Sequence, residues 1–350
     1  MMKDLNLSHK NQTRSSNFEL LHIVCMLFIV LGHLIMAHND VGIAEYMVSH
    51  IIRPFSIVAV NVFVMISGYF GIKFKVDRLI KLCTQTWFYA VGAFFVVVVL
   101  GLHVIDYKKD FLVLFPVFSK QYWFVTAYIA LYCIAPFFNE AIEKINFLTY
   151  KKGLLVGFLL FYAWPTFCFW VNAHQLVGDS GYGIVNFVYL YLLGRYIKLH
   201  YEDKKPAYFY LILYVISCFL LFLSQYLLSI FLGFEYSSWL SYNTIFVYFA
   251  AIFLFMCFKN ISMNIQIINI IAAPCLAVYL FHMTPYGWNH LVDLLMIRDA
   301  RGFVYIVMLL AYPFILYAVG FCIEKVRLFM GTWLENYICT LVGILIKKTL

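Results

Sequence analysis

The chain has 350 residues, of which 64% are hydrophobic, 20% are aromatic and only 12% are charged. A soluble domain carries about 25% charged residues, so this composition excludes water as the main solvent. The net charge of +8 is not accompanied by a basic helix with aromatic residues at base-stacking spacing. We therefore expect membrane lipids, and no nucleic acid, among its partners.

The apolar stretches, taken in chain order, predict about ten transmembrane helices. Each is long enough to cross about 30 Å of hydrocarbon at about 1.5 Å per residue. The predicted spans are 18–37, 51–72, 82–104, 122–138, 153–172, 183–199, 207–229, 243–258, 266–283 and 303–322. Residues 111–118 are too few to cross, and residues 333–346 suit an interfacial or re-entrant helix. The fold class predicted is an all-α, polytopic transmembrane bundle, with residues 1–350 as a single domain.

The distribution of Lys and Arg predicts that both termini face the cytoplasm. Cytoplasmic loops of membrane proteins are enriched in these residues. With the amino terminus inside, 19 Lys and Arg lie on the inner side and 6 on the outer side. Residues 1–17 then form a cytoplasmic segment, and residues 323–350 a cytoplasmic or interfacial one. The first span lacks a small-residue cleavage site, so we expect it to be retained as part of a multi-pass protein of the cytoplasmic membrane.

The first predicted span carries ionisable residues in an otherwise apolar helix, namely Glu19, His22 and His33. At about 100° per residue, the step from His22 to His33 completes about three turns, so both imidazoles share one face. Glu19 lies one turn before His22 and can hold it through a hydrogen bond. Ionisable groups in a span cost several kcal/mol unless they are paired or face a wet cavity, which makes these three candidate catalytic residues.

Histidine suits general-base catalysis because its ordinary pKa of about 6.5 leaves it largely neutral at cellular pH. A neutral His33 beside a bound hydroxyl can remove its proton as the oxygen attacks a thioester carbonyl. The pattern therefore predicts acyl transfer. For Glu19 and His22, a location in the lipid head-group zone is an equally good interpretation.

Further candidates contact the substrate in this interpretation. His282 ends the ninth span and can line one cavity with His33, or be an interfacial histidine beside aromatic residues. Arg53 and Asn61 in the second span are added as substrate-binding candidates. The fourth span opens with aromatic residues that can stack on a sugar ring or anchor the membrane interface: Tyr122, Trp123 and Tyr128.

A basic run follows the second span and contains Lys73, Lys75, Arg78 and Lys81. Ammonium and guanidinium groups bind phosphate through charge-assisted hydrogen bonds, so the run is a candidate site for a nucleotide-bearing acyl donor. Enrichment of basic residues on the cytoplasmic side explains it equally well. The nine cysteines are scattered without metal-ligand spacing, so we expect no metal.

The chain resembles the membrane-bound acyltransferase-3 family, which includes bacterial O-acetyltransferases of surface polysaccharides. The resemblance runs nearly end to end and is carried by the segments RSSNFELLHIVCMLFIVLGH, NVFVMISGYFGIK, QYWFVTAYIALYCIAPFFN, FVYLYLLGRYIK and AVYLFHMTPYGW. It implies about ten spans, cytoplasmic acetyl-CoA as donor, a glycan or lipid-linked saccharide as acceptor, and His33 as the catalytic histidine.

One position departs from the family pattern. The family places a basic residue, usually arginine, eleven positions before the catalytic histidine, where this chain has His22. Arginine is always charged and grips an anion in a fixed fork, which histidine imitates only when protonated. The site can use His22 weakly, recruit Arg14, or be impaired.

The leading hypothesis is thus acetyl-CoA-dependent O-acetylation of a capsular or other wall glycan. The alternatives are a transporter, flippase or polymerase of polysaccharide units, and a membrane sensor or scaffold. Helices interrupted at their midpoints in matching halves would favour a transporter, and the sequence shows none. The oligomeric state is not encoded in these patterns.

Overall fold

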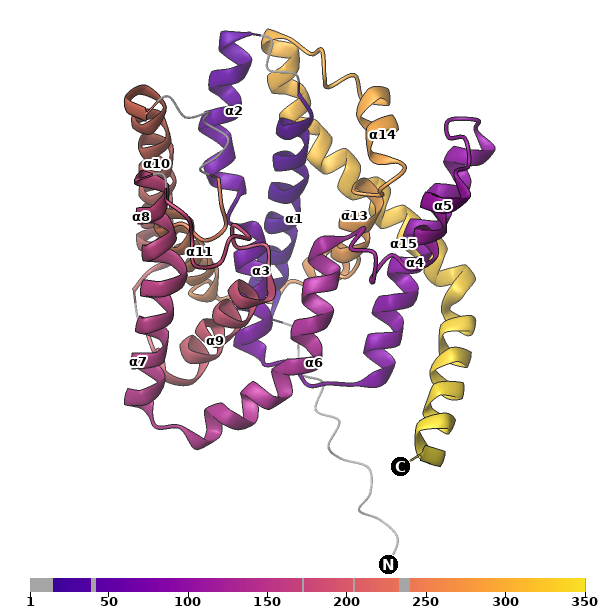
Figure 1. Cartoon of the computed structure of the whole chain (residues 1–350), viewed down its shortest axis with the longest axis horizontal. Helices are drawn as coiled ribbons and strands as arrows, with labels where there is room; N and C mark the ends of the chain where they lie inside the picture. Colours follow the sequence, from indigo (N-terminus) through magenta and orange to yellow (C-terminus); the bar gives the residue numbers. More distant parts are fainter. Residues whose placement is uncertain (1–14, 39–41, 172, 204, 233–239, 350) are drawn as a thin grey trace, which may run out of the picture.

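The computed structural model describes residues 15–38, 42–171, 173–203, 205–232 and 240–349. The regular structure of these segments is entirely helical, which confirms the predicted all-α class (Figure 1). Within them, seven helices are long and apolar enough to cross a membrane, namely Ser16–Ala37, Ile43–Phe70, Val76–Val99, Trp123–Lys144, Phe147–Trp170, Ala207–Phe231 and Gly302–Trp333. The chain is therefore a multi-pass membrane protein.

The helices follow one another through short connections. They are α1 Ser16–Ala37, α2 Ile43–Ser56, α3 Ala59–Phe70, α4 Val76–Val99, α5 Tyr107–Asp110, η1 Phe111–Leu114, α6 Trp123–Lys144, α7 Phe147–Phe158, η2 Leu159–Ala163, α8 Trp164–Trp170, α9 Ile184–His200, α10 Ala207–Leu232, α11 Ile245–Lys259, α12 Gln266–Ala272, α13 Cys275–His282, α14 Trp288–Leu294 and α15 Gly302–Thr349. We call the end of the bundle where α1 begins the lower end, as drawn in Figure 1, and the opposite end the upper end.

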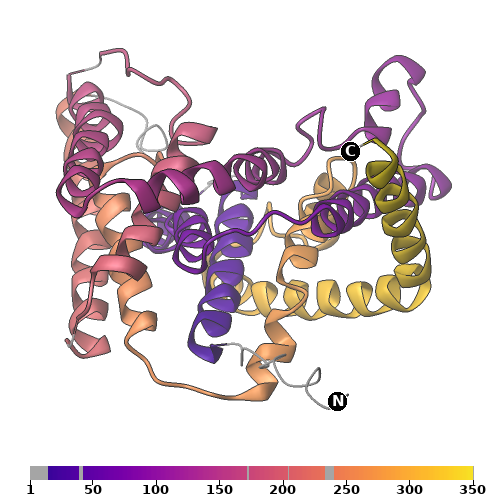
Figure 2. The same ribbon diagram turned by 90° about the horizontal axis from the view of Figure 1, so that it is seen from below.

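Each predicted span overlaps one helix or two to three consecutive helices, and most boundaries differ by a few residues. The two largest differences concern the start of the second span and the end of the last span. The second span does not begin at residue 51, because α2 begins at Ile43 and passes into α3 through a turn at Ile57 and Val58. The last span does not end at residue 322, because α15 continues without a break to Thr349 and bends before its final part (Figure 2). The separate helix expected over 333–346 is the end of α15.

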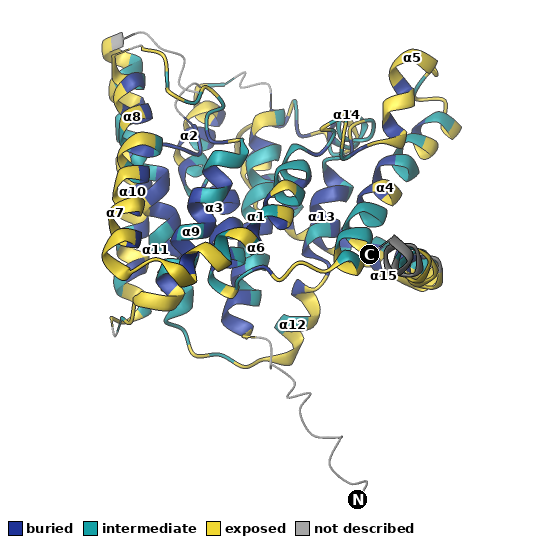
Figure 3. Ribbon diagram, turned by 60° about the horizontal axis from the view of Figure 1, so that its bottom comes forward, coloured by how far each residue is buried: buried dark blue, intermediate teal, exposed yellow. Residues whose placement is uncertain are grey.

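The helices that carry the site are packed at the centre of the bundle. Figure 3 shows that the residues of α1, α3 and α9 are for the most part buried or half-buried, whereas α7 and α10 expose much of their surface. Glycines let α3 and α9 approach backbone to backbone: a Cβ at Gly68 would lie 2.2 Å from the carbonyl oxygen of Tyr191, and one at Gly194 would lie 2.2 Å from that of Met65. Small residues at helix crossings are typical of membrane bundles.

Many large apolar side chains remain exposed on the outer helices, including Phe219 and Phe231 on α10 and Phe314 on α15. A soluble monomer rarely exposes contiguous apolar surface on this scale. This surface suits contact with lipid chains, in agreement with the composition.

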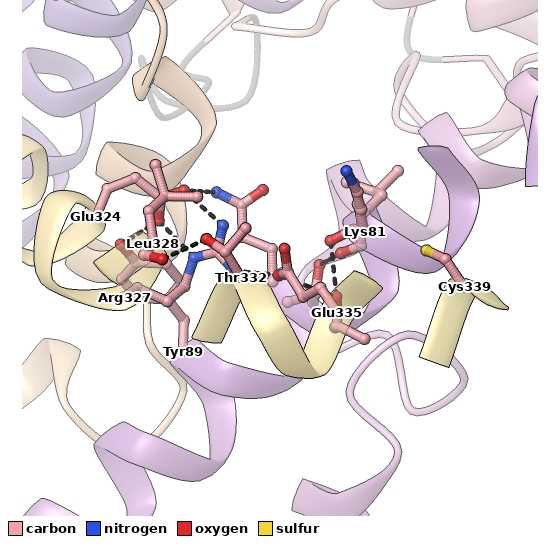
Figure 4. A network of polar contacts seen from close by, with 12 residues as sticks. Lys81, Tyr89, Glu324, Arg327, Leu328, Thr332, Glu335 and Cys339 are labelled. Carbon is pink, nitrogen blue, oxygen red and sulfur yellow. Dashed lines mark hydrogen bonds and ion pairs between the residues drawn. The ribbon is translucent and has the colours of Figure 1, made fainter. Parts of the chain in front are cut away.

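A buried ionic cluster joins α4 to α15 (Figure 4). The guanidinium of Arg327 donates two hydrogen bonds of 2.8 Å to the carboxylate of Glu324 and a third to Glu335. From α4, the Gln85 amide and the Tyr89 hydroxyl each donate to Glu324 at 3.0 Å. Each carboxylate oxygen of Glu324 therefore accepts two hydrogen bonds, and the charges of Arg327, Glu324 and Glu335 are paired within the cluster.

Candidate active site

One cavity of about 410 Å³ runs through the centre of the bundle. Its walls come from α1, α2, α3, α4, α6, α13 and the segments before α9 and α11. On α1 the lining residues extend from one end of the helix to the other and are His22, Met26, Phe28, Ile29, Gly32, His33 and Met36. The spacing of His22 and His33 predicted a shared face, and the structure confirms that both line this cavity. They lie eleven residues apart on α1, or about 16 Å.

His33 is held by a chain of two hydrogen bonds. Its Nδ1 lies 2.9 Å from Nε2 of His282, and Nδ1 of His282 lies 2.6 Å from the carbonyl oxygen of Val278. A carbonyl only accepts, so Nδ1 of His282 carries a hydrogen. In a neutral pair Nε2 of His282 is then the acceptor and Nδ1 of His33 the donor. This leaves Nε2 of His33 with a free lone pair, as a general base requires.

His282 stands behind His33 and does not line the cavity. It is fully buried, whereas His33 is half-buried and does line it. The indole of Trp288 packs edge-on against both imidazoles, with ring centroids 6.1 Å from His33 and 6.0 Å from His282. The sequence predicted that His282 contacts the substrate. In the structure His282 does not line this cavity and instead contacts His33.

At the lower end of the cavity, His22 stacks on Phe63 with ring centroids 5.4 Å apart. The carboxylate of Glu19 lies 3.5 Å from Nδ1 of His22, one turn before it on α1, as the sequence suggested. Ser67 and Tyr128 line the same part, and their hydroxyls are 3.4 Å apart. This end can accept a polar group that enters from below.

Three aromatic rings meet in another part of the wall of this cavity. Trp123 lies 4.6 Å from Tyr182 and 5.8 Å from Tyr242, measured between ring centroids, and Tyr182 lies 4.8 Å from Tyr242. All three line the cavity, as does Arg53. Sequence reasoning found Trp123 and Arg53 but missed the two tyrosines, because they belong to connecting segments where no helical periodicity marks a face.

Two predicted substrate-binding residues, Asn61 and Tyr122, do not line this cavity. Asn61 is fully buried, and its amide donates to the carbonyl of Tyr242 at 2.8 Å. The hydroxyl of Tyr122, also buried, donates to the carbonyl of Leu280 at 3.1 Å. Asn61 therefore supports the aromatic wall from behind, and Tyr122 fixes α13 near the histidine pair.

The predicted donor-binding residues lie at the lower end but outside the central cavity. Lys73 and Lys75 occupy the loop between α3 and α4, and Arg78 and Lys81 begin α4; all four are exposed. Lys73 lines a second cavity of about 360 Å³. Arg14 lies outside the described residues.

A carboxylate clasp, centred on Asp110, is formed at the end of α5. Asp110 accepts hydrogen bonds from Nε2 of His103 at 2.8 Å, from the backbone of Asp106 at 2.8 Å and from the Tyr286 hydroxyl at 2.9 Å. Burial alone would raise the pKa of Asp110, but these three donors outweigh it and lower that pKa below its ordinary value. The clasp ties the segment after α4 to the loop that leads into α14.

The described residues contain no group of three or more His, Cys, Asp and Glu side chains placed to hold a metal ion. What they offer is a largely apolar cavity lined by two histidines, of which His33 is hydrogen-bonded to a second, buried histidine.

Comparison with known proteins identifies the family. No curated protein and no solved structure matches the chain significantly. Residues 16–346 match the model of the acyltransferase-3 family, described as an acyltransferase domain. That match covers nearly the whole chain and includes every described candidate residue. The chain therefore belongs to the membrane-bound acyltransferase-3 family, and it is an acyltransferase.

Proposed function

We propose that this protein transfers an acetyl group from acetyl-CoA to a hydroxyl of a cell-surface or wall glycan, with His33 as the catalytic base. The observation that carries the proposal is the hydrogen-bonded pair of His33 and His282, whose one unused ring nitrogen belongs to a residue of the central cavity. The family match supports acyl transfer.

The chemistry follows from the state of the two rings. A sugar hydroxyl gives its proton to Nε2 of His33 as its oxygen forms a bond to the thioester carbonyl carbon. The resulting imidazolium still donates from Nδ1 to His282, which is anchored on Val278 and stabilises the positive charge. When the carbon–sulfur bond breaks, the proton on Nε2 passes to the leaving thiolate, and His33 returns to its starting state.

The two ends of the cavity suit the two reactants. The aromatic wall of Trp123, Tyr182 and Tyr242 offers ring faces to a saccharide within the cavity that His33 also lines. The lower end, with His22, lies toward the basic residues that follow α3. With the lower end in the cytoplasm, the donor enters from below and the acceptor from above, across the cytoplasmic membrane.

His22 occupies the position where the family usually has arginine. In this structure it is paired with Glu19 and stacked on Phe63, so it has a defined place at the entrance to the cavity. We propose that it orients the donor and plays no part in the proton transfer, which occurs about 16 Å away.

Mass spectrometry of the host's surface glycan, with and without the gene, tests the function. We expect each modified sugar to lose the mass of one acetyl group when the gene is removed, and to regain it on complementation. A glycan with unchanged acetylation but altered chain length, or one no longer exported, would contradict the proposal in favour of a polymerase or transporter.

A further inference from the structure

A second cavity opens at the lower end of the bundle, separate from the central one. It measures about 360 Å³ and lies between the loop after α3, the end of α6 and the end of α9. Gly71 and Lys73 line it from the loop, Asn139 from α6 and Arg195 from α9. This placement brings two cations together from segments more than a hundred residues apart.

The loop that forms one wall is fixed by side chains from the other two. The backbone N–H of Ile72 donates to the Tyr191 hydroxyl at 3.0 Å, and the amide of Asn139 donates to the Ile72 carbonyl at 2.9 Å. The backbone N–H of Lys75 donates to the Tyr132 hydroxyl at 2.9 Å. The cavity is therefore built in advance of any ligand.

The guanidinium of Arg195 lies directly over Gly71. A Cβ at Gly71 would come within 2.8 Å of Nη1 of Arg195, and the φ of Gly71 is +74°, a conformation that favours glycine. The Nε of Arg195 is buried, and it has no hydrogen-bond partner in the described part of the chain. A buried donor without an acceptor is costly, so this guanidinium is placed to receive one.

We propose that this cavity binds a phosphate group through Arg195 and Lys73. A guanidinium matches the geometry of phosphate with two parallel hydrogen bonds, and an ammonium adds a point charge. Two carboxylates also line the cavity, but both are exposed, and that of Glu140 is paired with Lys144 at 2.6 Å. The other, Glu143, is the second negative charge in the lining.

The phosphate can come from the acyl donor or from a lipid head group. The backbone N–H of Gly71 donates to the carbonyl of Ser67, which lines the central cavity, so the two cavities lie about one helical turn apart along the chain. A nucleotide phosphate held there would leave its thioester arm free to enter the central cavity. If the phosphate belongs to the acyl donor, the proposal rests on the proposed function. If it belongs to a lipid head group, the proposal is independent of that function.

Ligand-induced thermal stabilisation of the purified full-length protein tests the proposal without any acyl transfer. Coenzyme A is titrated in neutral detergent, and nanodiscs of phosphatidylcholine are compared with nanodiscs that contain phosphatidylglycerol. We expect Arg195→Gln to weaken the apparent affinity for the stabilising ligand by about tenfold or more, because a charge-assisted contact is lost. Lys73→Gln, on the surface, should weaken it less, and Lys152→Gln, exposed at the same end outside the cavity, should not change it.

The two sources give different results. Stabilisation by coenzyme A that depends on Arg195 identifies the donor, and stabilisation by phosphatidylglycerol alone identifies the lipid. If Arg195→Gln fails to fold, Lys73→Gln and Glu143→Gln decide, because removal of the Glu143 charge should tighten an anion site. The proposal is overturned if neither ligand stabilises the wild type, if both act equally on the wild type and the cavity variants, or if Glu143→Gln only destabilises the protein. His33→Ala should bind as the wild type does, which separates this test from the catalytic proposal.

Discussion

The ionic cluster around Arg327 and the pair of His33 and His282 differ in whether a reactive nitrogen is left without a hydrogen-bond partner. Around Arg327, every nitrogen of the guanidinium donates to a carboxylate, and none of the members lines the central cavity. In the pair of His33 and His282, the chain of hydrogen bonds uses three ring nitrogens and leaves the fourth, on a residue that does line the cavity.

Burial of charge in a membrane span therefore does not by itself mark an active site. The closed cluster has the form of a structural joint between α4 and α15, with its charges mutually satisfied. The pair of His33 and His282 has the form of a catalytic base. The chain of hydrogen bonds ends on the uncharged carbonyl of Val278, and His33 lines a cavity with space for a reactant. Four substitutions test the roles assigned to these groups and to the residues around them.

Arg327→Met should destabilise the fold without touching the chemistry. Removal of one partner leaves Glu324 and Glu335 buried without their counter-charge, which costs about 3–5 kcal/mol. Denaturant unfolding in detergent measures the loss, with Lys325→Met on the exposed face of the same helix as the control. Normal stability together with lost transfer would reverse the roles assigned to the two clusters.

His282→Phe should slow transfer while leaving the fold intact. The phenyl ring keeps the apolar packing against Trp288 but offers no acceptor to Nδ1 of His33, so the tautomer and orientation of the base are no longer set. We expect kcat to fall on the order of 10²-fold, within the range of general-base contributions, and KM for the donor to change little. Unchanged kcat would show that His33 needs no partner, whereas a changed pH profile of kcat would support positioning.

Trp123→Ala should weaken binding of the acceptor glycan more than binding of the acyl donor. Loss of an aromatic face from the cavity wall is worth about 1.4 kcal/mol, or about tenfold in KM for the glycan. Trp170→Ala, half exposed at the end of α8 and outside the cavity, is the matched control. An equal effect of both substitutions would mean that the aromatic wall has no role in acceptor binding.

The clasp at Asp110 should give the smallest effect and a defined pH dependence. Its pKa is lowered in the folded protein, so its stabilising contribution is present above the ordinary carboxyl pKa of about 4 and is lost as pH falls through the lowered value. Thermal stability should therefore not depend on Asp110 ionisation between neutral and mildly acidic pH. Asp110→Asn should lower stability slightly throughout that range, and a difference that appears only below neutrality would contradict this sign.

The sequence predicted the helical class and the position of most spans, because hydropathy reports directly on lipid exposure. It missed the turn at Ile57 and Val58 inside the second span and the continuity of α15 beyond residue 322. Both features depend on tertiary packing. The turn lies inside a continuous apolar stretch, so hydropathy does not mark it. The continuation of α15 contains the polar residue Glu324, which is tolerated because it accepts hydrogen bonds from α4.

The candidate site was predictable only where helical geometry applies. The face shared by His22 and His33 follows from their spacing on one helix. The contact between His33 and His282 joins residues 249 positions apart, and the aromatic wall combines Trp123 with loop residues Tyr182 and Tyr242. No distance between such residues can be derived from the amino-acid sequence alone. The same holds for Asn61, which supports the aromatic wall, and for Tyr122, which binds the Leu280 carbonyl.

The most direct test of the central claim is acyl transfer by His33→Gln in membranes that lack any other copy of the enzyme. A labelled acetyl donor is supplied, incorporation into glycan is measured, and both the amount of folded protein and coenzyme A binding are checked in parallel. We expect incorporation to fall by about 10²-fold or more, as loss of a general base requires, with folding and donor binding retained. Incorporation at the wild-type rate would contradict the assignment of His33 as the base.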